Sequence, residues 1–454
     1  MKSLLIRNIH TLVTMNAARE EIRNATMLVR GNRIAAIGPA ATMLGEQADE
    51  VLDLHGRHIV LPGLVNTHHH FYQHLTRAVP AAQDRELFGW LKTLYPIWAR
   101  MTPEGVRASA KLCAAELILS GCTTASDHLY LFPNGARLDD EIEAVAESGL
   151  RFHASRGSMS VGESQGGLPP DSIVEPEAQI LHDSQRLIET FHDPEPLSML
   201  RITLAPCSPF SVSPDLMRES AALARSHRGV RLHTHLAENQ LDVEYSREHY
   251  GQTPVEFAES VNWLGPDVWH AHCVWLDEPG IARFAHTGTG VAHCPCSNMR
   301  LASGIAPVAQ MCAAGVPVGL GADGAASNDA SNLLREARQA MFSARVRALD
   351  ATVMTARQAL ALATRGGARV LGREDIGSLV PGMAADFIAV NIDTPRLAGA
   401  QHDPVAGLLF CDEGGVDYSF INGRCVVKER HFLPFDLAPL SADVNRLSQQ
   451  MING

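Results

Sequence analysis

Residues 61–73 read LPGLVNTHHHFYQ, a short apolar run that ends in three consecutive histidines. Its length is typical of one buried strand, with polar side chains only where the strand ends. Seven later runs follow the same plan. They are TTASDHLYLF, FHASRGSM, ITLAPCSPF, VRLHTHLAE, VWHAHCVWL, GVAHCPCSN and PVGLGADGAASND.

Amphipathic segments separate these eight runs, for example PEGVRASAKLCAAELILSG at residues 103–121. Eight repeats of strand and helix predict an α/β fold, the (β/α)8 TIM barrel, over residues 62–363. In such a barrel the carboxyl ends of all strands meet at one mouth, where barrel enzymes carry their active sites. The polar strand ends are therefore the candidate site.

Both ends of the chain predict a second, smaller domain. Residues 1–61 and 364–437 read as short strands, with turns at Gly31-Asn32, His55-Gly56 and Asn422-Gly423. We expect the two parts to join into one β-sandwich. Residues 438–454 are expected to form a C-terminal helical tail.

The composition limits the partners. The 454-residue chain carries a net charge of −12 without a long acidic run, which argues against a nucleic-acid-binding surface and favours a small-molecule partner. No apolar run suits a signal peptide or a membrane span, and the nine cysteines are scattered. We expect a cytoplasmic protein with reduced thiols and no membrane partner. We also expect a homo-oligomer, a dimer or larger.

Paired histidines recur at the predicted strand ends. A chain with 21 histidines should contain about one H-x-H pair by chance, so the recurrence is the signal. Residues two apart in a strand share a face, so each pair should direct both rings into the mouth or both outward. The pairs are His68/His70, His233/His235 and His270/His272.

The motifs PGLVNTHHH, HTHLAE, HAHCV, SNMRLASGIAP, GADGAASND and GSLVPGMAADFIAV together resemble the amidohydrolase superfamily, in its aminohydrolase branch. The resemblance runs from about residue 5 to about residue 430. It implies a metal ion held by four ligands. His69, one residue out of phase, is expected on the opposite side of its strand. The implied ligands are His68, His70, His235 and Asp323.

The number of metal ions follows from a missing residue type. Two-metal members of the superfamily bridge their ions with a carboxylated lysine on the fourth strand, or with a carboxylate near that place. The fourth predicted strand, ITLAPCSPF, contains no lysine, aspartate or glutamate. One divalent ion per chain is therefore predicted, with Zn²⁺ as the best fit and Fe²⁺ as an alternative for nitrogen and oxygen ligands.

The chemistry is expected to be hydrolysis by water that the metal activates. Asp323 is expected to take the proton of the water, and His272 to fix the direction of attack. Glu238, three residues after His235, is expected to protonate a ring nitrogen as the general acid/base. The alternative for Glu238 is a solvated loop carboxylate.

A carboxylate that passes protons to a ring nitrogen suits the hydrolytic deamination of an aromatic amidine. The stretches NTHHHFYQHLTRAVPAAQDRELFGWLKTLYPIW and SRGSMSVGESQGGLPP resemble deaminases of 8-oxoguanine, which release urate and ammonia. Similar stretches occur in triazine hydrolases. Guanine, isoxanthopterin and S-adenosylhomocysteine are further candidate substrates in the same branch.

Four side chains are candidates for substrate contacts. Gln73 is expected to face a purine edge, while Trp90 and Tyr95 are expected to form an aromatic wall. Arg156, at the end of the third predicted strand, is expected to donate to a ring carbonyl. The alternatives are packing roles for the two aromatic residues and an acidic partner for Arg156. Arg300 stands where many relatives carry lysine, and no role is predicted for it.

Other classes of protein lack support in the sequence. A zinc deaminase of the cytidine type needs H-x-E with P-C-x-x-C, and a zincin needs H-E-x-x-H; both patterns are absent. A non-catalytic scaffold with the same barrel should have lost some ligands or the general acid/base. All four ligands, Glu238 and His272 are present, which favours an enzyme.

Overall fold

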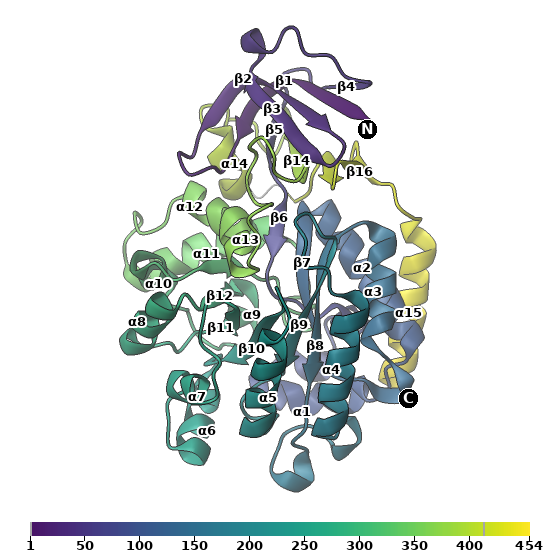
Figure 1. Cartoon of the computed structure of the whole chain (residues 1–454), viewed down its shortest axis with the longest axis vertical. Coiled ribbons are helices and arrows are strands. Elements are labelled where there is room, and N and C mark those ends of the chain that lie inside the picture. The colour runs from purple at the N-terminus through teal and green to yellow at the C-terminus, as the bar shows by residue number, and fades with distance from the viewer. Residues whose placement is uncertain (1, 412–413) are drawn as a thin grey trace.

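The computed structural model describes residues 2–411 and 414–454. Its main body is a closed barrel of eight parallel strands in chain order, in which the last strand pairs with the first through Leu320 and Asn66 (Figure 1). All eight predicted strands and the TIM barrel are confirmed. The strands are β6 (Leu64–Asn66), β7 (Cys122–Leu129), β8 (Arg151–Ser158), β9 (Leu200–Pro206), β10 (Arg231–Leu236), β11 (Val268–His272), β12 (Gly290–His293) and β13 (Val318–Leu320).

Helices surround the barrel, and several begin with the same local signal. Thr102, Ser213 and Thr253 each cap a helix through the side-chain oxygen, and each is followed by a proline at the first helical position. The surrounding helices are α1 (Leu87–Trp98), α2 (Pro103–Leu119), α3 (Leu138–Ser148), α4 (Glu177–Phe191), α5 (Pro214–Arg225), α6 (Gln240–Tyr250), α7 (Pro254–Ser260), α8 (Glu278–Thr287), α9 (Pro295–Arg300), α10 (Val308–Ala314), α11 (Leu333–Ala348), α12 (Ala356–Ala361) and α13 (Gly367–Val370).

Both chain ends contribute to a separate sheet, drawn above the barrel in Figure 1, as predicted. Where a β-sandwich was expected, the strands from the two chain ends form one continuous hydrogen-bonded sheet. They are β1 (Ser3–Val13), β2 (Glu21–Arg30), β3 (Arg33–Pro39), β4 (Glu50–Asp53), β5 (His58–Pro62), β14 (Phe387–Asn391), β15 (Tyr418–Ile421), β16 (Arg424–Lys428) and β17 (His431–Phe432).

Of the three predicted turns, two join paired antiparallel strands and one does not. The turns at Gly31 and at Asn422 join the antiparallel pairs β2/β3 and β15/β16. The chain also turns at His55-Gly56, but the strands on either side do not pair with each other. Both β4 and β5 run parallel to β1 instead.

Two helices complete the chain outside the barrel repeats: α14 (Pro404–Phe410) and α15 (Leu437–Asn453). The last helix lies along the side of the barrel, where Ser448 Oγ donates a hydrogen bond of 2.6 Å to the carbonyl oxygen of Leu75 (Figure 1). The domain boundaries at residues 61, 363 and 437 stay a prediction. None of the described helices combines the length and the apolar character that crossing a bilayer requires.

The sheet and the barrel are joined tightly where β5 runs into β6. Only Gly63 separates the two strands, and a Cβ atom there would lie 2.0 Å from Thr123 Oγ1, so glycine is required by the close approach of β7. Beside this junction, Arg151 at the start of β8 forms a buried bidentate ion pair with Asp386, with N–O distances of 2.8 and 3.1 Å. This ion pair connects the two parts of the chain where both side chains are buried.

Removing one partner of this ion pair should destabilise the fold strongly. Asp386→Ala leaves the Arg151 guanidinium buried without a counter-charge, for which we expect a loss of about 3–5 kcal/mol in the free energy of unfolding. Urea titration followed by circular dichroism measures it. Asp443→Ala, which removes an exposed partner of Arg446, is the control and should cost no more than about 1 kcal/mol. Similar small losses in both variants would show that the buried pair does not hold the two parts together.

Candidate active site

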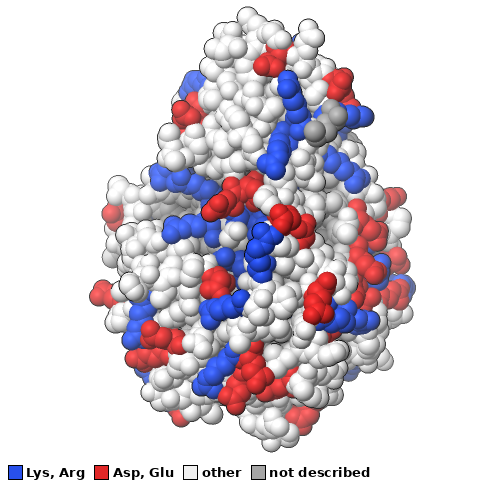
Figure 2. Space-filling model, in the orientation of Figure 1, with Lys and Arg blue, Asp and Glu red and all other residues white. Residues whose placement is uncertain are grey.

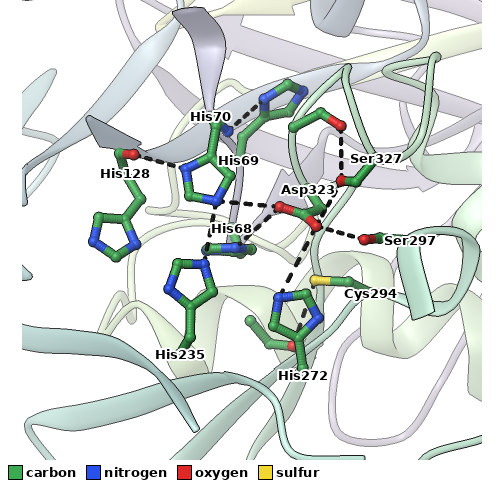
Figure 3. A network of polar contacts seen from close by, with 12 residues as sticks. His68, His69, His70, His128, His235, His272, Cys294, Ser297, Asp323 and Ser327 are labelled. Atoms are coloured by element: carbon green, nitrogen blue, oxygen red, sulfur yellow. Dashed lines mark hydrogen bonds and ion pairs between the residues drawn. The ribbon is translucent and has the colours of Figure 1, made fainter. Parts of the chain in front are cut away.

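Four side chains from three places in the sequence converge at the barrel mouth (Figure 3). His68 and His70 directly follow β6, His235 lies in β10, and Asp323 follows β13. The Nε2 atom of His70 lies 3.2 Å from Nε2 of His235. Oδ1 of Asp323 lies 3.2 Å from Nε2 of His68 and 3.3 Å from Nε2 of His70. The four predicted metal ligands therefore form one cluster.

The protons of these imidazoles are fixed by hydrogen bonds on the opposite side of each ring. Nδ1 of His70 lies 2.7 Å from the carbonyl oxygen of His128, and Nδ1 of His235 lies 2.6 Å from that of Cys207. A carbonyl oxygen only accepts, so both Nδ1 atoms carry the proton. Their Nε2 atoms, which face the cluster, are then bare.

His68 also carries its proton on Nδ1 and has a bare Nε2, because its Nδ1 bonds a second histidine. Nδ1 of His233 lies 3.0 Å from the carbonyl oxygen of Trp269 and must donate to it. Nε2 of His233 is therefore an acceptor, and it lies 2.8 Å from Nδ1 of His68. His68 donates its proton to His233 and leaves its own Nε2 bare.

This donor set fits a divalent metal ion. Bare nitrogen lone pairs at 3.2 Å repel one another unless a cation lies between them. His68 Nε2 and Asp323 Oδ1 are buried and make no hydrogen bond, although buried polar atoms are normally paired. Ligands at about 2.0–2.1 Å from a tetrahedral zinc ion would lie roughly 3.3 Å from one another. Burial also lowers the pKa of His235 to about 3, which keeps its imidazole neutral.

Two further side chains near the cluster are weaker ligand candidates. His128, at the end of β7, has a ligand atom within 4.8 Å of those of the three histidines. Its Nε2 donates to the carbonyl oxygen of Ala205 at 2.7 Å, and Asp323 lies closer to the cluster and supplies a negative charge. Burial raises the pKa of the Cys294 thiol well above its usual value, which disfavours the thiolate that a metal ion would bind.

The second oxygen of Asp323 is held by hydroxyl groups. Oδ2 accepts hydrogen bonds from Ser297 Oγ at 2.6 Å and from Ser327 Oγ at 2.9 Å (Figure 3). These bonds fix the carboxylate so that Oδ1 points at the three imidazoles. Asp323 itself has a left-handed backbone, with φ of 60°, which turns its side chain into the mouth.

Glu238 and His272 lie next to the cluster. Oε2 of Glu238 is 3.7 Å from Nε2 of His272, which is 4.0 Å from Oδ2 of Asp323. Burial raises the pKa of Glu238 to about 7, and the nearby carboxylates of Asp323 and Asp242 act in the same direction. A carboxyl group with this pKa exchanges protons at neutral pH, as a general acid/base must.

The behaviour of the His270/His272 pair differs from the expectation. The prediction that both rings share one face is wrong here. His270 Nε2 donates to the carbonyl oxygen of Trp263, and its ring contacts Phe284 on the outer helix α8. His272 instead faces Glu238 and bonds Asn298 Oδ1 at 2.9 Å. Its φ of 68° breaks the alternation of the strand at its last residue and turns the ring into the mouth.

His69 lies on the opposite side of its strand from its two neighbours, as predicted. Its Nε2 is 2.9 Å from Ser331 Oγ, and Cys113 contacts the same ring, so the side chain packs between the barrel and the outer helices. In Figure 3 the ring points away from the cluster.

A small cavity of about 30 Å³ adjoins the cluster. Gln73, Trp90 and Tyr95 line it together with Glu238 and His272. The hydroxyl of Tyr95 is buried and has no hydrogen-bond partner among the described residues. The cavity holds about one water molecule, so a larger ligand requires its apolar walls to move. These walls include Leu87, Leu91, Phe210 and Leu301.

The side chain of Gln73 packs against Gly324, which follows the strand β13. A Cβ atom at Gly324 would lie 1.9 Å from Gln73 Oε1, so only glycine leaves room for the amide. The amide has just two long contacts, a bond of 3.3 Å accepted from the Ala326 N–H and one of 3.5 Å donated to Tyr72 Oη. Most of its hydrogen-bonding capacity is free for a ligand.

Arg156 and Arg300 lie elsewhere and do not line the cavity. The guanidinium of Arg156 forms ion pairs with Glu175 and Asp183 at 2.8 and 2.9 Å. Arg156 therefore has acidic partners, which was the alternative to a contact with the substrate. Arg300 lies 3.3 Å from Asp329 and donates to the carbonyl oxygen of Gln83 at 2.7 Å.

Sequence reasoning assigned no role to several residues that shape the site. His233 was visible only as half of an H-x-H pair, and His128 shared the strand-end signal of the ligands. The hydroxyls of Ser297 and Ser327 carry no such signal, because serine is common in loops. Their contact with Asp323 depends on how the helix α9, which carries Ser297, meets the loop after β13, which carries Asp323 and Ser327.

A barrel with three imidazoles and a carboxylate at its mouth defines a metal-dependent enzyme of the TIM-barrel class. The chain belongs to the amidohydrolase family, whose sequence profile matches residues 59–426. The resemblance inferred from the motifs is thereby confirmed.

Individual relatives are similar over nearly the whole chain. 8-Oxoguanine deaminase from Pseudomonas aeruginosa is 49% identical over 400 residues, which are 88% of each chain. Hydroxydechloroatrazine ethylaminohydrolase from Pseudomonas sp. (strain ADP) is 37% identical over 471 residues, covering 100% of this chain and 97% of that protein. The crystal structure of atrazine chlorohydrolase TrzN from Arthrobacter aurescens TC1, complexed with zinc, superposes with a TM-score of 0.93 at 34% identity, covering 98% of this chain and 100% of that chain.

The hydrogen bond from His68 to His233 should contribute to metal affinity. His233→Ala removes the acceptor that holds the His68 proton, so we expect zinc affinity to fall roughly 10- to 100-fold. Competition with a chromophoric chelator measures the dissociation constant.

His270→Ala is the matched control, because it removes a buried imidazole from the next strand that bonds only away from the cluster. It should leave zinc affinity unchanged. Equal losses in the two variants would mean that His233 acts through general packing and not through the tautomer of His68.

Proposed function

We propose that the chain is a metal-dependent hydrolytic deaminase of an amino-purine, with 8-oxoguanine as substrate and urate and ammonia as products. The observation that carries this proposal is the single buried cavity that combines the metal cluster, a carboxyl group with a pKa near 7 and a free amide at Gln73. The 49% identity to 8-oxoguanine deaminase supports the choice of substrate.

We infer one zinc ion per chain, held by His68, His70, His235 and Asp323. The zinc in the related atrazine chlorohydrolase structure supports the metal. The absence of lysine and acidic residues from β9 supports a single ion, because no side chain there can bridge a second one. Iron(II) suits the same donor set. When bound, the ion would lower the pKa of water toward 7 and so supply a nucleophile at neutral pH.

The proton transfers fall to three side chains around the cavity. Asp323 is the first acceptor for the proton of the attacking water. His272 lies between the carboxylates of Asp323 and Glu238, where its Nε2 can hydrogen-bond the attacking oxygen and fix its direction. Glu238 gives its proton to a ring nitrogen. The proton held by Asp323 then passes to the leaving amine, which departs as ammonia, and Glu238 recovers a proton from the added hydroxyl group as the ring carbonyl forms.

The remaining lining residues bind the heterocycle. Gln73 presents a donor and an acceptor to the purine edge. The unpaired hydroxyl of Tyr95 offers one more hydrogen bond, which a substrate would complete. Trp90 forms an apolar wall, and its ring is fixed by a hydrogen bond of 3.2 Å from Nε1 to the carbonyl oxygen of Ala326.

Replacing the general acid/base should separate catalysis from metal binding. Glu238→Gln keeps the volume of the side chain but cannot transfer a proton, so we expect kcat to fall on the order of 10²- to 10⁴-fold while the zinc content is unchanged. Stopped assays of ammonia release, with zinc measured on the same sample, test this. Glu244→Gln, an exposed change on the adjacent helix α6, is the control and should retain full activity. Near-normal turnover by Glu238→Gln would reject the assignment.

The identity of the substrate is tested by ammonia release from a panel of heterocycles: 8-oxoguanine, guanine, isoxanthopterin, S-adenosylhomocysteine, cytosine and aminotriazines. The 8-oxo group turns N7 of the purine from an acceptor into a donor. A site matched to it leaves a buried group unpaired when guanine binds, at a cost of about 1–3 kcal/mol. We therefore expect kcat/KM for 8-oxoguanine to exceed that for guanine by roughly 10- to 100-fold.

Gln73→Ala should reduce turnover of both purines, because it addresses the edge that they share. Faster turnover of guanine or of an aminotriazine would overturn the choice of 8-oxoguanine. The proposed chemistry at Glu238 would then still stand, since the Glu238→Gln experiment tests it with any substrate that is turned over.

A further inference from the structure

Two adjoining cavities lie at the opposite end of the barrel from the metal cluster. They measure about 700 and 910 Å³, and Arg365 and Arg369 line both of them. Their walls include Val318 and Arg231, the first residues of β13 and β10. The cavities therefore adjoin the amino ends of the barrel strands, whereas the cluster lies at the carboxyl ends. Together we call them the arginine crevice.

The arginine crevice has an excess of positive charge, although the whole chain carries −12. Its only lining acids are Glu374 and Asp375. Asp375 is already used, because it forms an ion pair of 2.8 Å with Arg373 and accepts a hydrogen bond from the Leu197 N–H. Six arginines line the two cavities: Arg19, Arg201, Arg231, Arg365, Arg369 and Arg373.

Most of these guanidinium groups form no ion pair with an acid among the described residues, although Asp193 and Asp375 lie near Arg201 and Asp267 lies near Arg231. Within the part of the chain that the structure describes, the guanidinium groups of Arg19 and Arg369 make no hydrogen bond or ion pair. Arg365 donates only to the carbonyl oxygen of Asn16, at 3.3 Å. Arg231 donates to two carbonyl oxygens through Nη2, and its Nε is buried without any partner.

The arginines of the crevice also repel one another. Burial and the adjacent Arg373 lower the pKa of Arg201 to about 10, and burial followed by Arg19 lowers that of Arg365. Arg357, outside the crevice, is by contrast paired with Glu21 and Asp403. An unneutralised group of this size is an arrangement that a multivalent anion would stabilise.

Figure 2 shows the same arrangement on the surface. Blue side chains gather around the hollow between the small sheet and the barrel, over α13, with red side chains at its margin. Arg369, in α13, is an exposed member of the crevice, so an anion can reach it from solvent.

We propose that the arginine crevice is a binding site for a polyphosphate anion. Guanidinium groups bind phosphate oxygens through paired N–H donors, and among the described residues the guanidinium groups of Arg19 and Arg369 have these donors free. The arginines extend along two cavities, which favours an anion with several phosphate groups over a single phosphate. Inorganic polyphosphate and the phosphate chain of a nucleotide share this chemistry. The site does not depend on the substrate of the metal centre.

Calorimetric titration of the zinc-loaded full chain tests the proposal, with inorganic tripolyphosphate and ATP as probes and adenosine as the uncharged comparison. Zinc content is measured afterwards, because polyphosphates chelate metals. We expect one polyphosphate site per chain and no heat from adenosine. Tighter binding of ATP would identify a nucleotide, and equal binding would identify the phosphate chain alone; both outcomes support the site.

Charge-removing variants locate the binding. Arg369→Gln and Arg19→Gln remove guanidinium groups that have no partner in the fold, so both proteins should fold normally. Each variant should weaken tripolyphosphate binding roughly 10- to 100-fold, because it loses charged hydrogen bonds to the phosphate oxygens. Arg218→Gln, an exposed change on α5, is the matched control and should have no effect. Absence of binding to the unmodified chain, or binding that neither crevice variant weakens, would overturn the proposal.

Discussion

The ability of the barrel mouth to bind a metal ion depends on which nitrogen carries the proton in each of three imidazole rings. His70 and His235 donate theirs to main-chain carbonyl oxygens, and His68 donates through His233 to the carbonyl oxygen of Trp269. Carbonyl groups of a packed barrel cannot move aside or donate in return. The fold itself therefore sets the tautomers, and three bare nitrogens meet Asp323 in a buried space. This arrangement is unfavourable without a cation, so the barrel is built as a metal site.

Hydrogen bonds between the first and last barrel strands keep the histidines and Asp323 in position. β6 is short, yet the Thr67 hydroxyl donates to the carbonyl oxygen of Leu320, and the Asp323 N–H donates to that of His68. These bonds set the first and last strands in register, so that ligands more than 250 residues apart lie within 3.3 Å. The left-handed backbone at His272 and Asp323 carries local strain at the two positions where side chains must leave the strand direction.

The sequence alone predicts the parts that depend on local pattern. Apolar runs with polar ends predict all eight barrel strands, and the resemblance to the amidohydrolase superfamily implies the cluster of His68, His70, His235 and Asp323. What it misses depends on contacts between distant segments. The acids that bind Arg156 are Glu175, 19 residues later and before α4, and Asp183, 27 residues later and within α4. No sequence pattern connects either acid with Arg156. The inward turn of His272 results from one dihedral angle that strand alternation cannot predict.

X-ray absorption at the zinc edge of the zinc-loaded protein measures which atoms bind the metal ion and whether a second ion lies beside it. The account predicts one zinc ion per chain, with nitrogen and oxygen neighbours at about 2.0–2.1 Å and the multiple scattering typical of imidazole. A zinc–sulfur distance of about 2.3 Å would show that Cys294 is a ligand, and a second metal at about 3.5–4 Å would show a two-metal centre. Either result would contradict a single ion held by three imidazoles and Asp323.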